Sequence, residues 1–149
     1  MAGVFFYMDT GEVSLTATTA KTALEITAAA NHRVLIHEIN VMFKGTTVTN
    51  EPVTVQLTRF ATTGTGTSGT AQKYDPDYSE TIQATWKYND TVEPGSQTVL
   101  KTWAIHPQSG VIYPLPIDRP IPLPGGDLIG IRCTADDAVT VLVSILAEE

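Results

Sequence analysis

Residues 129–145 read IGIRCTADDAVTVLVSI, and this stretch decides the fold class. Apolar side chains occupy alternate positions on both sides of Asp136 and Asp137, as in a β-strand, whose successive side chains point to opposite faces. The two acidic residues suit a tight turn. The stretch therefore predicts two strands joined as a hairpin, each with one apolar face.

Further strands follow from the same alternation. It is clear at residues 53–58 and weaker at residues 12–17, 23–28, 81–88 and 99–106. Between residues 33 and 43 the apolar positions change parity, which predicts a β-bulge near His37 and Glu38, because one extra residue reverses the face to which side chains point. Segments of this length and spacing predict an all-β, two-sheet sandwich of about eight strands.

Threonine content supports strands over helices. The chain has 23 threonines, and this β-branched residue suits the exposed face of a pleated sheet better than a helix. The alanine run at residues 28–30 and Pro76 are two places where a short helix could form. We expect little helix overall.

Composition excludes several classes of protein. A length of 149 residues predicts one domain, and a net charge of -7 argues against a nucleic-acid partner. The single cysteine, Cys133, rules out an intrachain disulfide and reads as a small core residue. No apolar run approaches the ~18 residues of a membrane helix, and no targeting segment is evident. We expect a soluble, non-secreted protein without a membrane partner.

Two irregular segments carry separate expectations. Residues 113–126, YPLPIDRPIPLPGG, contain five prolines that remove backbone donors mainly from one side of an extended chain. This pattern favours a protected sheet edge, with a rigid polyproline arm as the alternative. Residues 62–70, TTGTGTSGT, predict a loop that is ordered only when a partner contacts it.

Catalytic and metal-binding motifs are missing from the sequence. His32, His37 and His106 form no metal-binding pattern, and no serine lies in a nucleophile motif. The acidic residues of segment 75–80 look like calcium ligands, yet Pro76 and the missing turn glycine favour a solvated loop. We expect a non-enzymatic protein with no catalytic residue, no metal and no cofactor.

The most unusual feature is an apolar N-terminal segment, because chain ends are ordinarily polar and frayed. We divide the chain into an N-terminal arm, residues 1–11, and a β-sandwich domain, residues 12–149. The apolar segment is either a first strand covered by its own core or an arm that docks on a neighbouring chain by strand addition, and we expect the second. Together with two tyrosines of the loop after residue 70, the predicted partner-binding residues are Val4, Phe5, Phe6, Tyr7, Met8, Tyr74 and Tyr78.

Several longer segments resemble a known family. These are EVSLTATTAKTALEITAAANHRVLIHEINVMFKGT (residues 12–46), WAIHPQSGVIYPLP (103–116), IPLPGGDLIGIRCTA (121–135) and the acidic end LAEE (146–149). They are similar to the small jelly-roll decoration, or cement, proteins of tailed-bacteriophage heads.

The resemblance implies a jelly-roll sandwich and a structural, non-enzymatic role. It further implies a homotrimer that is made in the host cytoplasm and binds the major capsid protein on the outer surface of the virion, where it stabilises the head.

Two other classes of function remain open. A carbohydrate- or receptor-binding β-sandwich of a phage tail or fibre would present Trp86, Trp103, Tyr74 and Tyr78 as an aromatic platform. Alternation instead places both tryptophans on apolar faces. A cupin-like enzyme would need a metal-binding H-x-H motif, which this sequence lacks.

Overall fold

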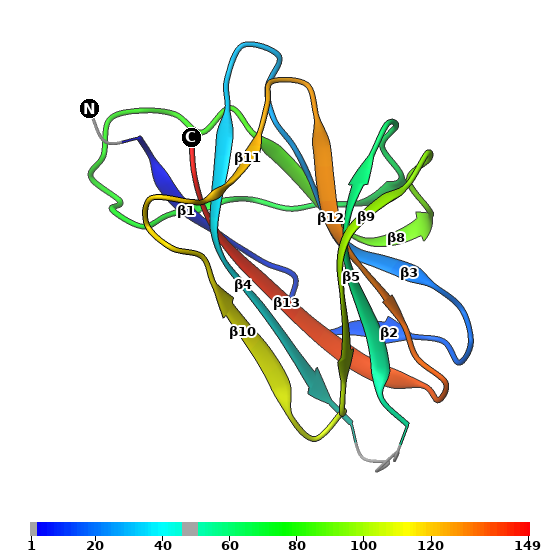
Figure 1. Cartoon of the computed structure of the whole chain (residues 1–149). Coiled ribbons are helices and arrows are strands. Elements are labelled where there is room, and N and C mark those ends of the chain that lie inside the picture. The colour runs from blue at the N-terminus through cyan, green and yellow to red at the C-terminus, as the bar shows by residue number, and fades with distance from the viewer. Residues whose placement is uncertain (1–2, 46–50) are drawn as a thin grey trace.

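The computed structural model describes residues 3–45 and 51–149 as two packed sheets of antiparallel strands (Figure 1). The predicted all-β, two-sheet sandwich is confirmed. The described residues contain no helix, so neither the alanine run nor Pro76 begins one. They contain thirteen strands rather than about eight.

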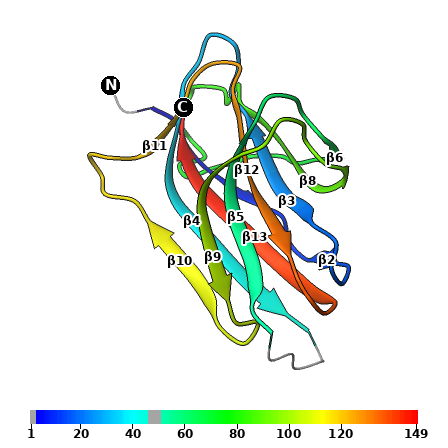
Figure 2. The same cartoon turned by 45° about the vertical axis from the view of Figure 1, so that its right-hand side comes forward.

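The strands divide between a seven-stranded and a six-stranded sheet, which Figure 2 shows from a second direction. The seven-stranded sheet contains β1 (Phe5–Asp9), β2 (Val13–Leu15), β4 (Val34–Lys44), β7 (Gln72–Lys73), β10 (Gly110–Pro114), β11 (Ile121–Leu123) and β13 (Val139–Glu148). The six-stranded sheet contains β3 (Lys21–Thr27), β5 (Val53–Phe60), β6 (Thr65–Ser68), β8 (Thr85–Val92), β9 (Thr98–Ile105) and β12 (Leu128–Thr134).

The strand pairing is that of a jelly roll. β1 and β2 pair with β13, β3 pairs with β12, β4 pairs with β10 and β11, and β5 pairs with β9. The first part of the roll thus pairs with the last, the second with the second last, and so on inward, as when one long hairpin is rolled into two sheets. β13 then packs beside β4, and β12 beside β5. The strand count exceeds eight because irregular residues divide two long strands into β1 with β2 and β10 with β11, and because the short β6 and β7 and the longer β8 lie outside the eight paired strands of the roll.

The core lies between the two sheets and follows the alternation of the sequence. Every second side chain of β13 is buried, from Val139 to Ala147. Cys133 is also buried there, and burial raises the pKa of its thiol to about 12, so the thiol stays protonated at neutral pH. This agrees with its predicted role as a small core residue.

The parity change in β4 is a β-bulge, as predicted. Leu146 of β13 lies opposite Glu38, whereas the next residue, Ala147, lies opposite Ile36. His37 is therefore the extra residue of β4. The bulge directs Ile36 and Ile39 to the same core, although three positions separate them.

The predicted hairpin of residues 129–145 is wrong, although both of its strands are present. β12 belongs to the six-stranded sheet and β13 to the seven-stranded sheet, so the two strands do not pair. Alternation requires only that the apolar faces meet a common core, and two strands of opposite sheets meet it as well as two neighbours do. The turn at Asp136 and Asp137 crosses from one sheet to the other.

The N-terminal arm is also corrected by the structure. β1 lies in the seven-stranded sheet between β13 and β7, and Phe6 and Met8 are buried in the chain's own core. The physical reason is that covering large apolar side chains stabilises the fold wherever a paired strand can place them inside. The sandwich therefore includes Phe5–Asp9; residues 1 and 2 of the expected arm lie outside the described residues.

The two irregular segments have different outcomes. Residues 62–70 are ordered by their own chain, because β6 pairs with β8 and Glu25 accepts hydrogen bonds from the Thr63 hydroxyl and the Gly64 amide. The expectation of a loop that waits for a partner is wrong. The proline-rich segment contains the end of β10 and all of β11, which lie beside β4 at the edge of their sheet, as predicted.

Candidate binding surface and cavity

The residues of the N-terminal segment that were predicted to bind a partner divide into an inward and an outward set, because side chains alternate along β1. Phe6 and Met8 point into the core and cannot contact a partner, whereas Val4 is buried at the end of the sheet beside two cavities. Phe5 and Tyr7 point to the opposite, outer side of the sheet. The Phe5 ring packs against His37, with 5.2 Å between ring centroids. Only the outward half of the segment is therefore available for binding.

Tyr74 joins this outward half through β7. The pairing of β7 with β1 places the Tyr7 and Tyr74 rings 5.9 Å apart, and the Tyr74 amide donates a hydrogen bond of 2.8 Å to the Phe5 carbonyl. Tyr7 is 40% exposed and Tyr74 is 66% exposed. The prediction thus names two tyrosines that the tertiary structure brings together on the surface.

More apolar side chains extend from Tyr7 across the seven-stranded sheet. The register places Tyr7 opposite Leu146, and Leu142 opposite Met42. Ile112, on the neighbouring β10, is 60% exposed. We define the outer face as the outward side chains Tyr7, Met42, Ile112, Leu142 and Leu146. Met42 and Leu142 line a cavity of about 150 Å³ on this face, together with the polar residues Asp9, Asn40 and Ser144.

The other sheet has a different exterior. Its outward positions on β5 and β12 are polar in the same cross-strand rows: Thr134 lies opposite Thr54, and Arg132 lies opposite Gln56. This polar pattern in the middle of a sheet is typical of a face exposed to water. On this sheet the exposed apolar side chains Val92, Val99 and Leu100 lie on the outer strands β8 and β9. On the seven-stranded sheet apolar side chains also stand on the central strands β4 and β13, which makes its outer face the better candidate to contact another apolar surface.

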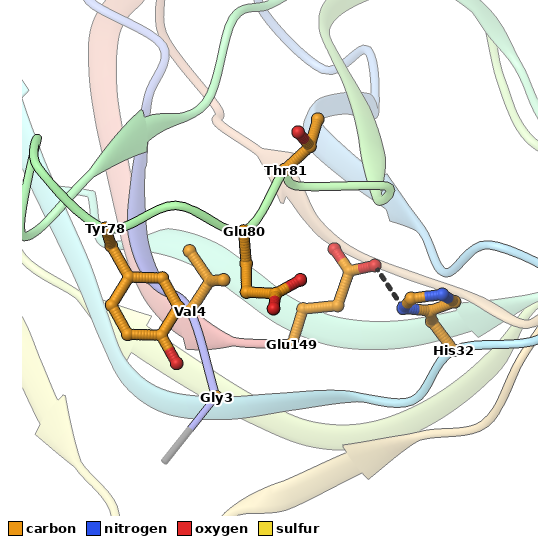
Figure 3. A pocket seen from close by; sticks show the side chains of 7 residues that line it. All are labelled: Gly3, Val4, His32, Tyr78, Glu80, Thr81 and Glu149. Carbon is orange, nitrogen blue, oxygen red and sulfur yellow. Dashed lines mark ion pairs between the residues drawn. The ribbon is translucent and has the colours of Figure 1, made fainter. Parts of the chain in front are cut away.

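A second feature lies at the start of β1 and the end of β13. The structure has a cavity of about 300 Å³ there, which we call the acidic cavity (Figure 3). Strand pairing holds its base together, because Val4 and Glu149 exchange two backbone hydrogen bonds of 2.9 and 3.0 Å. Its lining residues are Gly3, Val4, His32, Tyr78, Glu80, Thr81 and Glu149.

Glu149 is the anchored acid of this cavity. Its side chain is only 4% exposed, and its Oε2 accepts hydrogen bonds from the amides of Gln83 and Ala84, at 2.8 and 2.9 Å. Its Oε1 lies 2.9 Å from His32 Nδ1 and forms an ion pair when that histidine is protonated. The neighbouring Glu148 pairs in the same way with His37, at 2.9 Å.

The remaining candidates from the sequence have structural roles. His106 Nδ1 accepts a hydrogen bond from the Gln108 amide, and Asp75 accepts one from the Asp77 amide within its loop. In residues 3–45 and 51–149, no group of three or more histidine, cysteine, aspartate or glutamate side chains is placed to hold a metal ion.

The aromatic platform required by a carbohydrate-binding module is not assembled. Trp86 is buried against Gly69, and Trp103 packs edge-on against Tyr113 between β9 and β10. Tyr74 and Tyr78 belong instead to the opposite edge, where they line a smaller cavity of about 130 Å³.

Sequence reasoning missed the acidic cavity. His32, Glu80 and Glu149 lie far apart in the chain, and no motif links them. The only signal was the tyrosine pair of the YDPDY segment, because Tyr78 lines both cavities.

Comparisons with known proteins add no relative. No family model matches the chain, and no match was found among curated proteins or solved structures. Within the described residues, no helix is long and apolar enough to cross a membrane.

Proposed function

We propose that the protein is a non-enzymatic decoration protein of a tailed-bacteriophage head. In this proposal a homotrimer binds the major capsid protein on the outer surface of the assembled virion and stabilises the shell. The observation that carries the proposal is the outer face of the seven-stranded sheet, where the rigid strands β1, β4, β10 and β13 hold apolar side chains toward solvent. The sequence resemblance and the jelly-roll pairing support the same role.

The outer face suits a binding surface for two physical reasons. Covering its apolar side chains lowers the free energy by ~25 cal/mol for each Å² of apolar surface removed from water. Its side chains also stand on paired strands, so little backbone freedom is lost on binding. The acidic groups Asp9 and Glu38 lie among the apolar side chains of this face and favour a complementary, basic partner surface.

Stabilisation of the shell follows from linkage. A protein that binds the assembled shell, and not its separated subunits, lowers the free energy of the shell in proportion to the logarithm of its concentration over its dissociation constant. A specific interface buries at least ~1,200 Å². Three linked sites in a trimer then raise the total affinity well above that of one site.

A matched pair of substitutions tests this proposal. Ile112 on the outer face and Val92 on β8 of the other sheet are both 60% exposed. We expect Ile112→Ser to weaken binding to purified undecorated heads by ~10-fold or more, as truncation of a central contact does. Val92→Ser keeps wild-type affinity. Binding is measured by co-sedimentation, and head stability by the temperature of DNA release.

Two results would overturn the proposal. One is that the wild-type protein fails to co-sediment with heads or leaves their release temperature unchanged. The other is that both substitutions weaken binding equally, which would show that the outer face is not the surface that binds the head.

A further inference from the structure

We propose that residues 63–69, which include β6, form a lid over the side chains of Asp90 and Trp86, and that this lid opens when the Asp90 carboxyl group loses its proton. The lid is a conformational switch that responds to pH. The inference goes beyond the decoration role and does not depend on it, because β6 belongs to the six-stranded sheet and not to the outer face.

Three glycines allow the lid to lie directly on the two side chains. A Cβ at Gly64 or Gly66 would lie 2.7 or 2.1 Å from a carboxylate oxygen of Asp90, and a Cβ at Gly69 would lie 2.2 Å from the Trp86 ring. Glycine is the residue that permits so close an approach of the backbone. The glycines of this segment therefore form the underside of a close-fitting lid.

The lid covers three buried polar atoms that have no hydrogen-bond partner among residues 3–45 and 51–149. They are both carboxylate oxygens of Asp90 and Nε1 of Trp86. Both side chains are buried, so the closed lid keeps water away from them. A buried polar atom without a partner raises the free energy of the state that contains it. Opening supplies all three atoms with water and so removes this cost.

The contacts that hold the lid are few and local. β6 lies at the edge of its sheet and pairs with β8. Thr65 lies opposite Val92 and Thr67 lies opposite Tyr88, so the pairing skips residues 89–91, which include Asp90. At the start of the lid, Glu25 of β3 accepts hydrogen bonds from the Thr63 hydroxyl and the Gly64 amide.

The chain is anchored on both sides of the lid. Thr62 forms a bridge with Gly95 before it, and β7 pairs with β1 of the other sheet after it. Residues 63–69 can therefore move away from Asp90 while both sheets keep their central pairing. Local opening of such an edge segment requires less free energy than unfolding of the whole domain.

The charges around Asp90 favour its protonated form while the lid is closed. The charged groups that face it are Glu25 and Lys21 on β3, Lys87 on β8, Glu93 directly after β8 and, through Glu93, Arg132 on β12. β6 itself, Thr65–Ser68, has no charged residue. Burial and the two glutamates raise the pKa of Asp90 to about 7, against a smaller lowering by the two lysines.

Opening becomes easier as pH rises. In the open state water solvates Asp90, so its pKa returns toward the ordinary value of 3.8. Between about pH 4 and pH 7 the closed state holds a proton that the open state has released, and the opening constant rises ~10-fold for each pH unit. Above pH 7 Asp90 is ionised in both states, and the opening constant becomes independent of pH.

Hydrogen exchange of the full chain, followed by NMR, tests the lid. The reporters are the amides of Gly64 and Gly69, which donate hydrogen bonds of 3.2 and 3.0 Å to the Glu25 carboxylate and the Trp86 carbonyl. We expect their protection factors, which correct for the intrinsic effect of pH on exchange, to fall ~100-fold or more between pH 4 and pH 7.

The Thr10 amide is the internal reference for global unfolding, because it donates a hydrogen bond of 3.0 Å to the Val143 carbonyl in the other sheet. We expect its protection factor to exceed those of Gly64 and Gly69 at every pH. Low concentrations of urea should speed exchange at Thr10 and leave exchange in the lid nearly unchanged, because local opening exposes little surface.

Asp90→Asn assigns the effect of pH to this carboxyl group. The variant keeps nearly the shape of the protonated acid but cannot ionise, so the protection of Gly64 and Gly69 should no longer fall between pH 4 and pH 7. The Thr10 amide in the same sample shows that the variant remains folded.

A pair of glycine variants tests the fit of the lid on Trp86. Gly69→Ala places a methyl group against the Trp86 ring and prevents complete closure, whereas a Cβ at Gly45 meets nothing within 4 Å, so Gly45→Ala is the control. Trp103→Phe leaves Trp86 as the only tryptophan of the chain. In this background at pH 5, we expect acrylamide to quench Trp86 fluorescence more strongly with Gly69→Ala than with Gly45→Ala.

Three outcomes would overturn the inference. The first is that Gly64 and Gly69 show the same protection and urea dependence as Thr10, because the lid would then open only with global unfolding. The second is that their protection does not fall with pH, or falls equally in Asp90→Asn. The third is equal quenching in the two glycine variants. All three are measured without heads, so they are distinct from a failure of head binding.

Discussion

Asp90 shows how far one residue can depart from its ordinary chemistry. Its side chain is buried on β8, and neither carboxylate oxygen receives a hydrogen bond from residues 3–45 or 51–149. β6 and the residue before it cover Asp90 closely, because a Cβ at Gly64 or Gly66 would collide with its carboxylate oxygens. Burial, together with the nearby Glu25 and Glu93 carboxylates, raises the pKa of Asp90 to about 7, against a smaller lowering by Lys87 and Lys21.

This pKa predicts a stability that depends on pH. The folded chain holds the Asp90 proton up to pH about 7, whereas an ordinary aspartate releases it near 3.8, so folding binds a proton between these values. The resulting stability is complete below pH ~4 and is lost as pH rises through 7, by a total on the order of 2–4 kcal/mol. Urea unfolding at pH 4 to 8 measures the loss.

Asp90→Asn is the matching variant, because its neutral amide has nearly the shape of the protonated acid. We expect its free energy of unfolding to change less with pH than that of the wild type. The stability of the variant relative to the wild type is therefore greater at pH 8 than at pH 4. Parallel pH profiles for the two proteins would contradict this explanation of the Asp90 environment.

At the scale of elements, β1 combines two functions in alternate residues. Its inward residues close the core beside β13, and its outward residues contribute to the outer face. The backbone of β1 is paired on both sides, with β13 and with β7. A strand paired in this way stabilises its own chain and is not available for strand addition to another.

Substitutions in β1 separate these two roles. Phe6→Ala should lower the free energy of unfolding by about 3–5 kcal/mol, as expected when a fully buried aromatic side chain is removed. Tyr7→Ala, at the adjacent exposed position, should lower it by less than ~1 kcal/mol and weaken head binding instead. Urea unfolding and co-sedimentation measure the two effects, and equal destabilisation by both variants would contradict the division.

For the whole molecule, both sheets protect their long edges against direct pairing. Prolines lie along β10 and β11 at one edge of the seven-stranded sheet. On β9, an edge of the six-stranded sheet, the Lys101 ammonium lies over the Trp103 and Tyr113 rings at 5.6 and 5.4 Å. Prolines and inward charges oppose edge-to-edge association, so copies of the chain are expected to associate through side chains.

The proposed homotrimer gives a direct solution prediction. At micromolar concentration, light scattering should give a mass near three times the 16.0 kDa of one chain, because the low charge fraction of 17% leaves large weakly repelling surfaces. The mass should persist at high salt if apolar contacts dominate. A mass near 16.0 kDa would reject the trimer and leave the outer face as a surface of a monomer.

Alternation by itself determined the main strands of the two sheets, their inward and outward faces and the bulge at His37. It could do so because side-chain direction in a strand depends only on backbone geometry. The same local rule placed Trp86 on an apolar face, and the missing N–H groups of Pro114 and Pro122 predicted a sheet edge. Tyr7 was predicted to bind a partner as part of the apolar N-terminal segment, and Tyr74 as part of the loop after residue 70. The structure brings their rings together on the surface.

Only the tertiary structure decided which strands are neighbours and which acids share a cavity. β12 and β13 satisfy the same alternation whether they pair in one sheet or face each other across the core, so the local pattern could not distinguish the two. Glu149 meets His32 and Glu80 because rolling one long hairpin into two sheets brings distant segments together. The free energy of these contacts depends on burial and on nearby charges, which exist only in the folded chain.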